Sequence, residues 1–139
     1  MKIRISQIDG LAVAGKAEDS PWVTMDAPLN VGGQGGGARP MQVMLIGMAG
    51  CAAMDVISIL NKRRLDLRRY EMEAEGTIAD EHPKVFTHIK LVHKIFGKDI
   101  KASDVERAIQ LTDEKYCGAL TMAKKTAEVV HEYEIREMD

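Results

Sequence analysis

Short runs of alternating apolar and polar residues predict most of the strands in this sequence. In residues 2–8, Ile3 and Ile5 alternate with Lys2 and Arg4, which is the pattern of a strand with one buried face. The same reasoning predicts further strands at residues 11–17, 22–27, 69–79, 85–96 and 129–136. We therefore expect a protein with a substantial sheet content.

The strand expected at 85–96 has the clearest two-faced pattern. One face carries apolar side chains, namely Val85, Ile89, Leu91 and Ile95. The opposite face carries polar ones, namely His88, Lys90 and Lys94. One face of this strand is thus expected to pack in the core while the other faces solvent.

Residues 41–60 form the most apolar stretch of the chain. Its only strongly polar residues are Gln42, Asp55 and Ser58. Pro40 suits the first turn of a helix, so we predict a helix over residues 40–62. The length would also fit a bilayer, but Asp55 in lipid would cost roughly 2.5–3.5 kcal/mol. Because the amphipathic strands need an apolar partner, we expect this helix to lie buried at the centre of a compact domain.

Two helical pieces are predicted between the last two strands. Ser103 and Glu106 form a capping box that would open a helix over 103–111. Thr112 resembles a second N-cap and would open another over 113–128. The order is β-β-β-α-β-β-α-α-β, which indicates an α+β fold with a long buried helix against a largely antiparallel sheet.

Composition bounds the class of protein. The chain has 139 residues, of which 45% are hydrophobic and 29% are charged, as in a single globular domain over residues 1–139. The net charge of −2 leaves no large basic field, so nucleic acid is not an expected partner. The N-terminus has no secretory signal and the two cysteines are sparse, which favours a cytoplasmic location away from membranes.

Several kinds of site are disfavoured by the motifs. The glycine-rich run at 32–37 lacks the Lys-Ser/Thr ending of a phosphate loop and is interpreted as a flexible loop. The four histidines do not pair at metal-ligand spacing, and neither cysteine belongs to a C-x-x-C motif. We therefore expect solvated histidines, no metal site and no bound cofactor.

The two cysteines, Cys51 and Cys117, are the remaining candidates for chemistry. Cys51 lies in the middle of the long helix among small residues, and Cys117 lies about one turn into the last helical piece. Asp55, four residues after Cys51, disfavours a thiolate there. A reactive Cys51 would therefore need a cation from elsewhere in the chain, and the candidates are Arg39, Arg4 and Lys16.

The sequence around these cysteines resembles the OsmC/Ohr family of thiol peroxidases over essentially the whole chain. The resemblance is carried by RPMQ at 39–42, GMAGC at 47–51 and DEKYC at 113–117. DVISIL at 55–60 and FTHI at 86–89 are most similar to the OsmC-like branch of unassigned function.

The resemblance implies a fold, an assembly and a mechanism. It implies an intertwined homodimer with two sites at the subunit interface. Cys51 would attack an organic hydroperoxide and become a sulfenic acid, and Cys117 would condense with it to a disulfide. A small dithiol or lipoyl partner would reduce that disulfide. Arg39, Gln42 and Asp55 are the expected supporting residues.

One departure from the family pattern keeps other functions open. Active members place a glutamate just after the proline that opens the helix, where this chain has Met41 and Gln42. Glutamine forms hydrogen bonds but cannot hold an arginine as an ion pair. Besides a peroxidase, the sequence is therefore compatible with a non-catalytic binding or sensing module that holds an apolar molecule at the dimer interface. It is also compatible with a structural dimer whose cysteines are inert.

Overall fold

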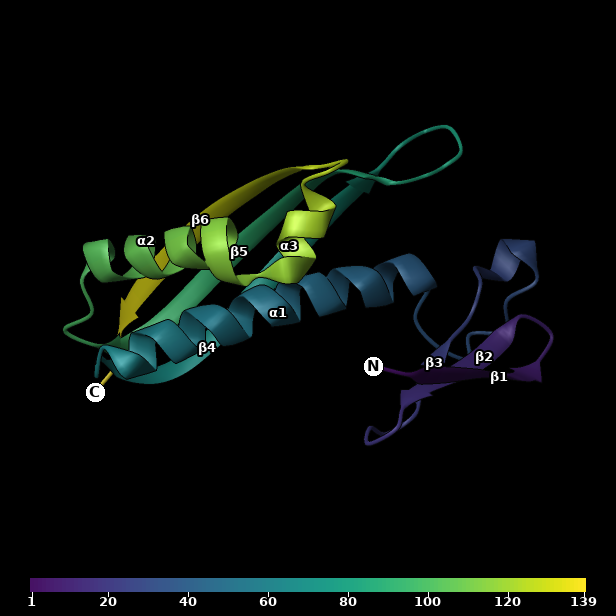
Figure 1. Ribbon diagram of the computed structural model, residues 1–139, viewed down its shortest axis with the longest axis horizontal. Coiled ribbons are helices and arrows are strands. Elements are labelled where there is room, and N and C mark those ends of the chain that lie inside the picture. The colour runs from purple at the N-terminus through teal and green to yellow at the C-terminus, as the bar shows by residue number, and fades with distance from the viewer. The chain divides into compact units, whose positions relative to one another are not determined.

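The computed structural model describes residues 1–139 and divides into two compact units, Met1–Leu45 and Ile46–Asp139 (Figure 1). The helix α1 spans Pro40–Lys62 and therefore begins in the first unit and continues in the second. These bounds confirm the helix predicted over 40–62. The mixed α+β class is confirmed as well, with two three-stranded sheets rather than one.

The first unit is built on an antiparallel sheet of β1 (Ile3–Asp9), β2 (Ala12–Ala17) and β3 (Val23–Met25), in that order. Gly10 lies in the turn between β1 and β2 with a positive φ of 54°, a conformation that glycine adopts without strain. Every residue of β1 is exposed within the single chain, including Ile3 and Ile5. The first unit by itself therefore leaves these apolar side chains uncovered.

The glycine-rich segment is tied to the buried carboxylate of Asp26. Its Oδ2 accepts hydrogen bonds from the backbone N–H groups of Gln34, at 2.9 Å, and Gly36, at 3.0 Å, and its Oδ1 accepts one from Ala27 at 2.7 Å. These bonds hold the pKa of Asp26 below its usual value. Gly37 is required because a Cβ there would lie 2.4 Å from the carbonyl oxygen of Thr24. The glycine-rich run at 32–37, expected to be a flexible loop, is thus held by hydrogen bonds, and a short 3-10 helix, η1 (Leu29–Val31), precedes it.

Substituting Asp26 with asparagine is expected to lower the urea midpoint of unfolding. The asparagine side chain has the same shape as that of aspartate, but its NH2 group replaces one carboxylate oxygen. A donor then faces a backbone N–H group, and that hydrogen bond is lost. Asp19→Asn, at an exposed position that makes no side-chain hydrogen bond, is the matched control. If both variants unfold at the same urea concentration, Asp26 does not organise this turn.

The second unit contains a sheet of β4 (Asp66–Ile78), β5 (Phe86–Lys98) and β6 (Glu128–Glu137), in that order. β4 and β5 pair antiparallel, whereas β5 and β6 pair parallel. Parallel neighbours need a crossover connection, and here it consists of the helices α2 (Ala102–Leu111), η2 (Thr112–Tyr116) and α3 (Gly118–Ala123). The sheets are therefore largely antiparallel, as predicted, with one parallel pair.

The core of this unit lies where α1 and α2 pack against β5. Its fully or nearly fully buried members are Val56, Leu60, Ile95, Ile100, Val105, Ala108 and Ile109. Only one face of α1 takes part, since Met54 is 69% exposed. The long helix is thus confirmed, but its burial within one chain is confined to a single face. α1 is also long and apolar enough to cross a membrane, a criterion that core helices of water-soluble proteins meet as well.

The capping predictions for the last two helical pieces are wrong in detail. α2 begins at Ala102, because the N–H groups of Asp104 and Val105 both bond to the carbonyl of Lys101, so Ser103 does not cap it. Thr112 does not open a new helix either. The chain continues from α2 into η2, a single π-helical turn, and the last helix starts only after Cys117.

Candidate functional site

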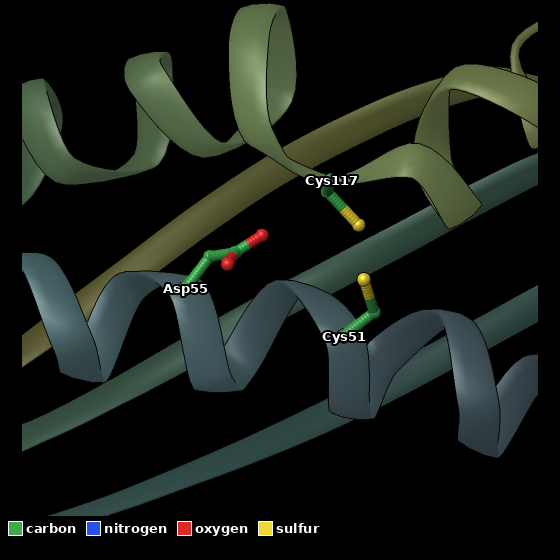
Figure 2. A group of neighbouring side chains, drawn as sticks. All are labelled: Cys51, Asp55 and Cys117. Atoms are coloured by element: carbon green, nitrogen blue, oxygen red, sulfur yellow. The ribbon is translucent and has the colours of Figure 1, made fainter.

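Three side chains that are distant in sequence meet in the second unit. Cys51 and Asp55 lie one turn apart on α1, and Cys117 faces them from the other side of the site. The sulfur atoms of the two cysteines and a carboxylate oxygen of Asp55 all lie within 4.8 Å of one another. Figure 2 shows the two sulfurs directed toward each other, with the Asp55 carboxylate on the same side of α1.

The backbone between α2 and α3 sets the position of Cys117. The π-helical turn ends with the Cys117 N–H donating to the carbonyl of Thr112 at 2.9 Å. Cys117 is then the N-cap of α3, and its sulfur accepts a hydrogen bond from the Leu120 N–H at 3.4 Å. The expectation that Cys117 lies inside a helix is therefore wrong. Its place at the start of α3 fixes the sulfur toward α1.

The two thiols differ in their surroundings. Cys117 is only 1% exposed, whereas Cys51 is partly exposed. Burial raises the pKa of Cys117 to about 11, and its contact with Cys51 and the charge of Asp55 add to this effect. Cys117 therefore stays a protonated thiol near neutral pH, and Cys51 is the more accessible sulfur.

Alkylation of the native protein should distinguish the two cysteines. At neutral pH we expect iodoacetamide to modify Cys51 well before Cys117, because the thiolate is the reactive form and Cys117 holds its proton. A time course followed by peptide mass mapping measures both rates, and a sample denatured in urea shows full reactivity of each thiol. Equal native rates would contradict this description of the site.

The other expected supporting residues have local contacts of their own. The Gln42 side chain accepts a hydrogen bond from the backbone N–H of Arg39 at 2.9 Å. In a capping box, the side chain of the third helical residue makes this bond to the backbone of the N-cap residue. Arg4 and Lys16 lie over the ring of Trp22 in the first unit. Among the expected site residues, the structure brings Cys51, Asp55 and Cys117 together.

A pocket of about 410 Å³ adjoins Asp55 within the second unit. Its lining residues are Asp55, Ser58, Ile59, Lys62, Arg63, Arg107, Leu111 and Tyr116. Arg63 pairs with Asp104, whereas Lys62 and Arg107 have no acidic partner. The sequence analysis did not name these basic side chains of α1 and α2, which line the same pocket as Asp55.

Buried histidines form a second feature that the sequence interpretation missed. His93 is fully buried, and its Nδ1 bonds to the Tyr70 hydroxyl at 2.6 Å while its Nε2 bonds to His131 Nδ1 at 3.0 Å. His131 Nε2 bonds in turn to Asp113 at 3.1 Å, and Lys124 pairs with the same carboxylate at 3.0 Å. The expectation of solvated histidines is wrong for these two.

The series of hydrogen bonds from Tyr70 to Asp113 determines which ring nitrogen of each histidine carries a proton. The Asp113 carboxylate accepts, so His131 Nε2 donates; in neutral His131, Nδ1 then accepts from His93 Nε2. His93 Nδ1 is left to accept from the Tyr70 hydroxyl. Partial burial of Asp113 opposes its ionisation, but the bonds from Lys124 and His131 prevail and hold its pKa below the usual value. This network anchors Asp113, and with it the turn that leads to Cys117.

A signal for these histidines exists in the strand pattern. His93 has the same parity as Ile89, Leu91 and Ile95, which form the buried face of β5. His131 lies directly opposite Leu91 in the parallel pairing of β5 with β6. A histidine at an inward position of a buried strand needs hydrogen-bond partners, and the alternation alone indicates that position.

Comparisons with known proteins agree with this architecture. A sequence model of the family described as OsmC-like protein matches residues 33–132. Protein YhfA of Escherichia coli K12 is 35% identical over 136 residues, covering 97% of this chain and 98% of YhfA. An OsmC-like protein from Mycoplasma pneumoniae superposes with a TM-score of 0.81 at 13% identity, covering 96% of this chain and 95% of its own. The organic hydroperoxide resistance protein OhrB of Bacillus subtilis gives a TM-score of 0.64 at 15% identity, covering 96% and 98%.

The long helix, the sheet beneath it and the facing cysteines define an α+β protein with a two-cysteine site. The match to the family sequence model and the similarity to YhfA along nearly the whole chain then show the relationship. The chain belongs to the OsmC-like protein family.

Proposed function

We propose that this protein reduces organic hydroperoxides with a pair of cysteines, Cys51 and Cys117. The observation that carries the proposal is the direct approach of the two sulfur atoms across the site. One structural relative, OhrB of Bacillus subtilis, is an organic hydroperoxide resistance protein, and this supports the same class of substrate. The two cysteines differ in burial, which suits different roles: the partly exposed Cys51 would attack the peroxide, and the buried Cys117 would resolve the sulfenic acid.

The Cys51 thiolate attacks one oxygen of the hydroperoxide, the O–O bond breaks, and the alcohol leaves after taking a proton. Cys51 is then a sulfenic acid, and the Cys117 sulfur attacks it to form the disulfide while water leaves. Asp55 would accept the proton that Cys117 gives up and pass it to the leaving hydroxide, which departs as water. A dithiol, such as a dihydrolipoyl group, reduces the disulfide and is itself oxidised.

The supporting roles and the assembly belong to the same proposal. Gln42 stabilises the start of the helix that carries Cys51, and Arg39 is the proposed cation for its thiolate in an assembled dimer. An intertwined homodimer would cover apolar side chains that a single chain leaves exposed, such as Ile3, Ile46 and Met54. A cytoplasmic location would keep both thiols reduced between turnovers.

The direct test is catalytic consumption of an organic hydroperoxide by the full chain. With tert-butyl hydroperoxide and excess dihydrolipoamide, we expect many equivalents of peroxide to be consumed per protein chain. The matched control is the same protein with both thiols alkylated. Consumption that stays at the rate of the alkylated protein would overturn the proposal.

A second candidate function is supported by the pocket beside Asp55. Its combination of Ile59, Leu111 and Tyr116 with unpaired Lys62 and Arg107 suits a small apolar molecule that carries a negative charge. A binding or sensing module would hold such a molecule without turnover. Native mass spectrometry of the purified protein distinguishes the two functions, because a stably bound small molecule with no peroxide consumption would favour the binding module.

A further inference from the structure

The cluster of Cys51, Asp55 and Cys117 has the donor set of a metal site. No C-x-x-C motif or histidine spacing in the sequence predicts this site, because the third donor, Cys117, is distant in sequence and lies at the start of α3. The first two donors are four residues apart on α1, a spacing that places both on one face of the helix. Zinc sites that leave one coordination position open have three protein ligands, which is the number of donors here.

An unpartnered oxygen gives independent support for a cation here. Asp55 Oδ2 is buried and has no hydrogen-bond partner in the protein. A buried carboxylate oxygen without a partner loses the hydration that stabilises its charge, so it requires a proton, a water molecule or a cation. A cation bound to this oxygen and to both sulfurs would displace the protons of the two thiols, including that of the buried Cys117.

The chemistry of the donors selects the metal. Two sulfurs and one carboxylate favour Zn²⁺ over Mg²⁺ and Ca²⁺, which prefer oxygen ligands alone. Tetrahedral zinc holds two thiolate sulfurs about 3.8 Å apart, given Zn–S bonds of about 2.3 Å. Donor atoms that already lie within 4.8 Å of one another reach this spacing by small side-chain rotations. The Leu120 N–H bonded to Cys117 would also steady a coordinated sulfur.

The surroundings leave room for a fourth ligand. Asp55 lines the pocket of about 410 Å³, so the pocket reaches one of the three donors. Two thiolates and a carboxylate around Zn²⁺ carry a net charge of −1. The unpaired Lys62 and Arg107 along the same pocket complement that charge.

From these observations we propose that the reduced protein binds one Zn²⁺ per chain through Cys51, Asp55 and Cys117, with the fourth position open to the pocket. Binding replaces two S–H protons with two S–Zn bonds and changes no oxidation state. The metal and a Cys51–Cys117 disulfide exclude each other, because a disulfide leaves no thiolate to coordinate. The site does not depend on peroxide reduction, and its test uses no peroxide.

Cobalt(II) is the probe of choice because its absorption reports both ligand type and geometry. Titration of the reduced, metal-free full chain under anaerobic conditions is expected to give an intense thiolate-to-cobalt band and tetrahedral visible absorption. Both should saturate at one cobalt per chain and disappear on addition of Zn²⁺. Zn²⁺ should also slow the alkylation of Cys51 in the wild-type protein, which requires no variant.

Variants assign the ligands. Asp55→Asn is expected to weaken binding at least about tenfold, the effect of losing even an outer-shell partner of a metal ligand. Cys117→Ser should lose one thiolate from the cobalt spectrum, and Asp80→Asn, at an exposed carboxylate, should bind as the wild type does. The proposal is overturned if the wild-type protein gives no thiolate band or less than one cobalt per chain. It is equally overturned if a folded Asp55→Asn protein binds with unchanged affinity, since two thiols would then hold the metal alone.

Discussion

Substituting Cys51 with serine is expected to abolish hydroperoxide reduction, on the order of 10³-fold or more, because the attacking sulfur is lost. Substituting Cys117 with serine should leave the first oxidation intact, because Cys51 is partly exposed and keeps its thiol. That variant should consume about one equivalent of peroxide and stop as a sulfenic acid. Rapid mixing with one equivalent of hydroperoxide, followed by mass spectrometry with a sulfenic-acid trap, measures both outcomes.

The pair of variants separates the roles of the two cysteines. With excess peroxide, Cys117→Ser should proceed to the sulfinic acid, because no second thiol captures the sulfenic intermediate. Far-ultraviolet circular dichroism and urea unfolding of each variant control for loss of the fold. If Cys51→Ser retains wild-type consumption and Cys117→Ser does not, the assignment of attacking and resolving cysteines is reversed. If both variants retain it, neither sulfur carries the reaction.

Stability is expected to fall as the pH is lowered from about 6.5 to about 4. Burial, followed by the neighbouring His131, lowers the pKa of His93 to about 4, whereas an unfolded histidine titrates near 6.5. Between these values the unfolded chain binds a proton that the folded chain does not, so acid favours unfolding in this window. The shift corresponds to about 3 kcal/mol of unfolding free energy, present above pH 6.5 and lost by pH 4.

The structure gives this pH dependence a specific control. Urea unfolding across the window should show the full slope for the wild type and for His88→Gln, since His88 is exposed on the outer face of β5. His93→Gln should be less stable at pH 7 but show a weaker slope, because glutamine keeps hydrogen-bonding groups and does not titrate. Asp26 and Asp113 have lowered pKa values and act only at lower pH. An unchanged slope in His93→Gln would contradict a buried neutral His93.

The sequence was informative where one local pattern dominates. The apolar run after Pro40 predicts the bounds of α1, and alternation predicts the strands to within a few residues, because both depend on short-range periodicity. The same alternation places His93 on the buried face of β5, but residue type alone favours a solvated histidine. The sequence does not show the partners Tyr70 and His131, whose hydrogen bonds satisfy a histidine at that buried position.

The candidate site depends on features that short-range patterns do not contain. The two cysteines are 66 positions apart, and they meet only because the crossover between β5 and β6 brings the start of α3 over α1. Thr112 has the sequence features of an N-cap, yet α2 continues into a π-helical turn that moves the next helix start to Cys117. The family resemblance predicted the cysteine pair and Asp55 as a supporting residue, whereas the short distances among the three side chains needed the structure.

The measurement that tests the two-cysteine reaction most directly is the intact mass of reduced protein after one equivalent of an organic hydroperoxide. We expect the loss of two hydrogens, together with a non-reducing peptide map that links Cys51 to Cys117. An unchanged mass, with both thiols still available for alkylation after denaturation, would contradict the proposed function.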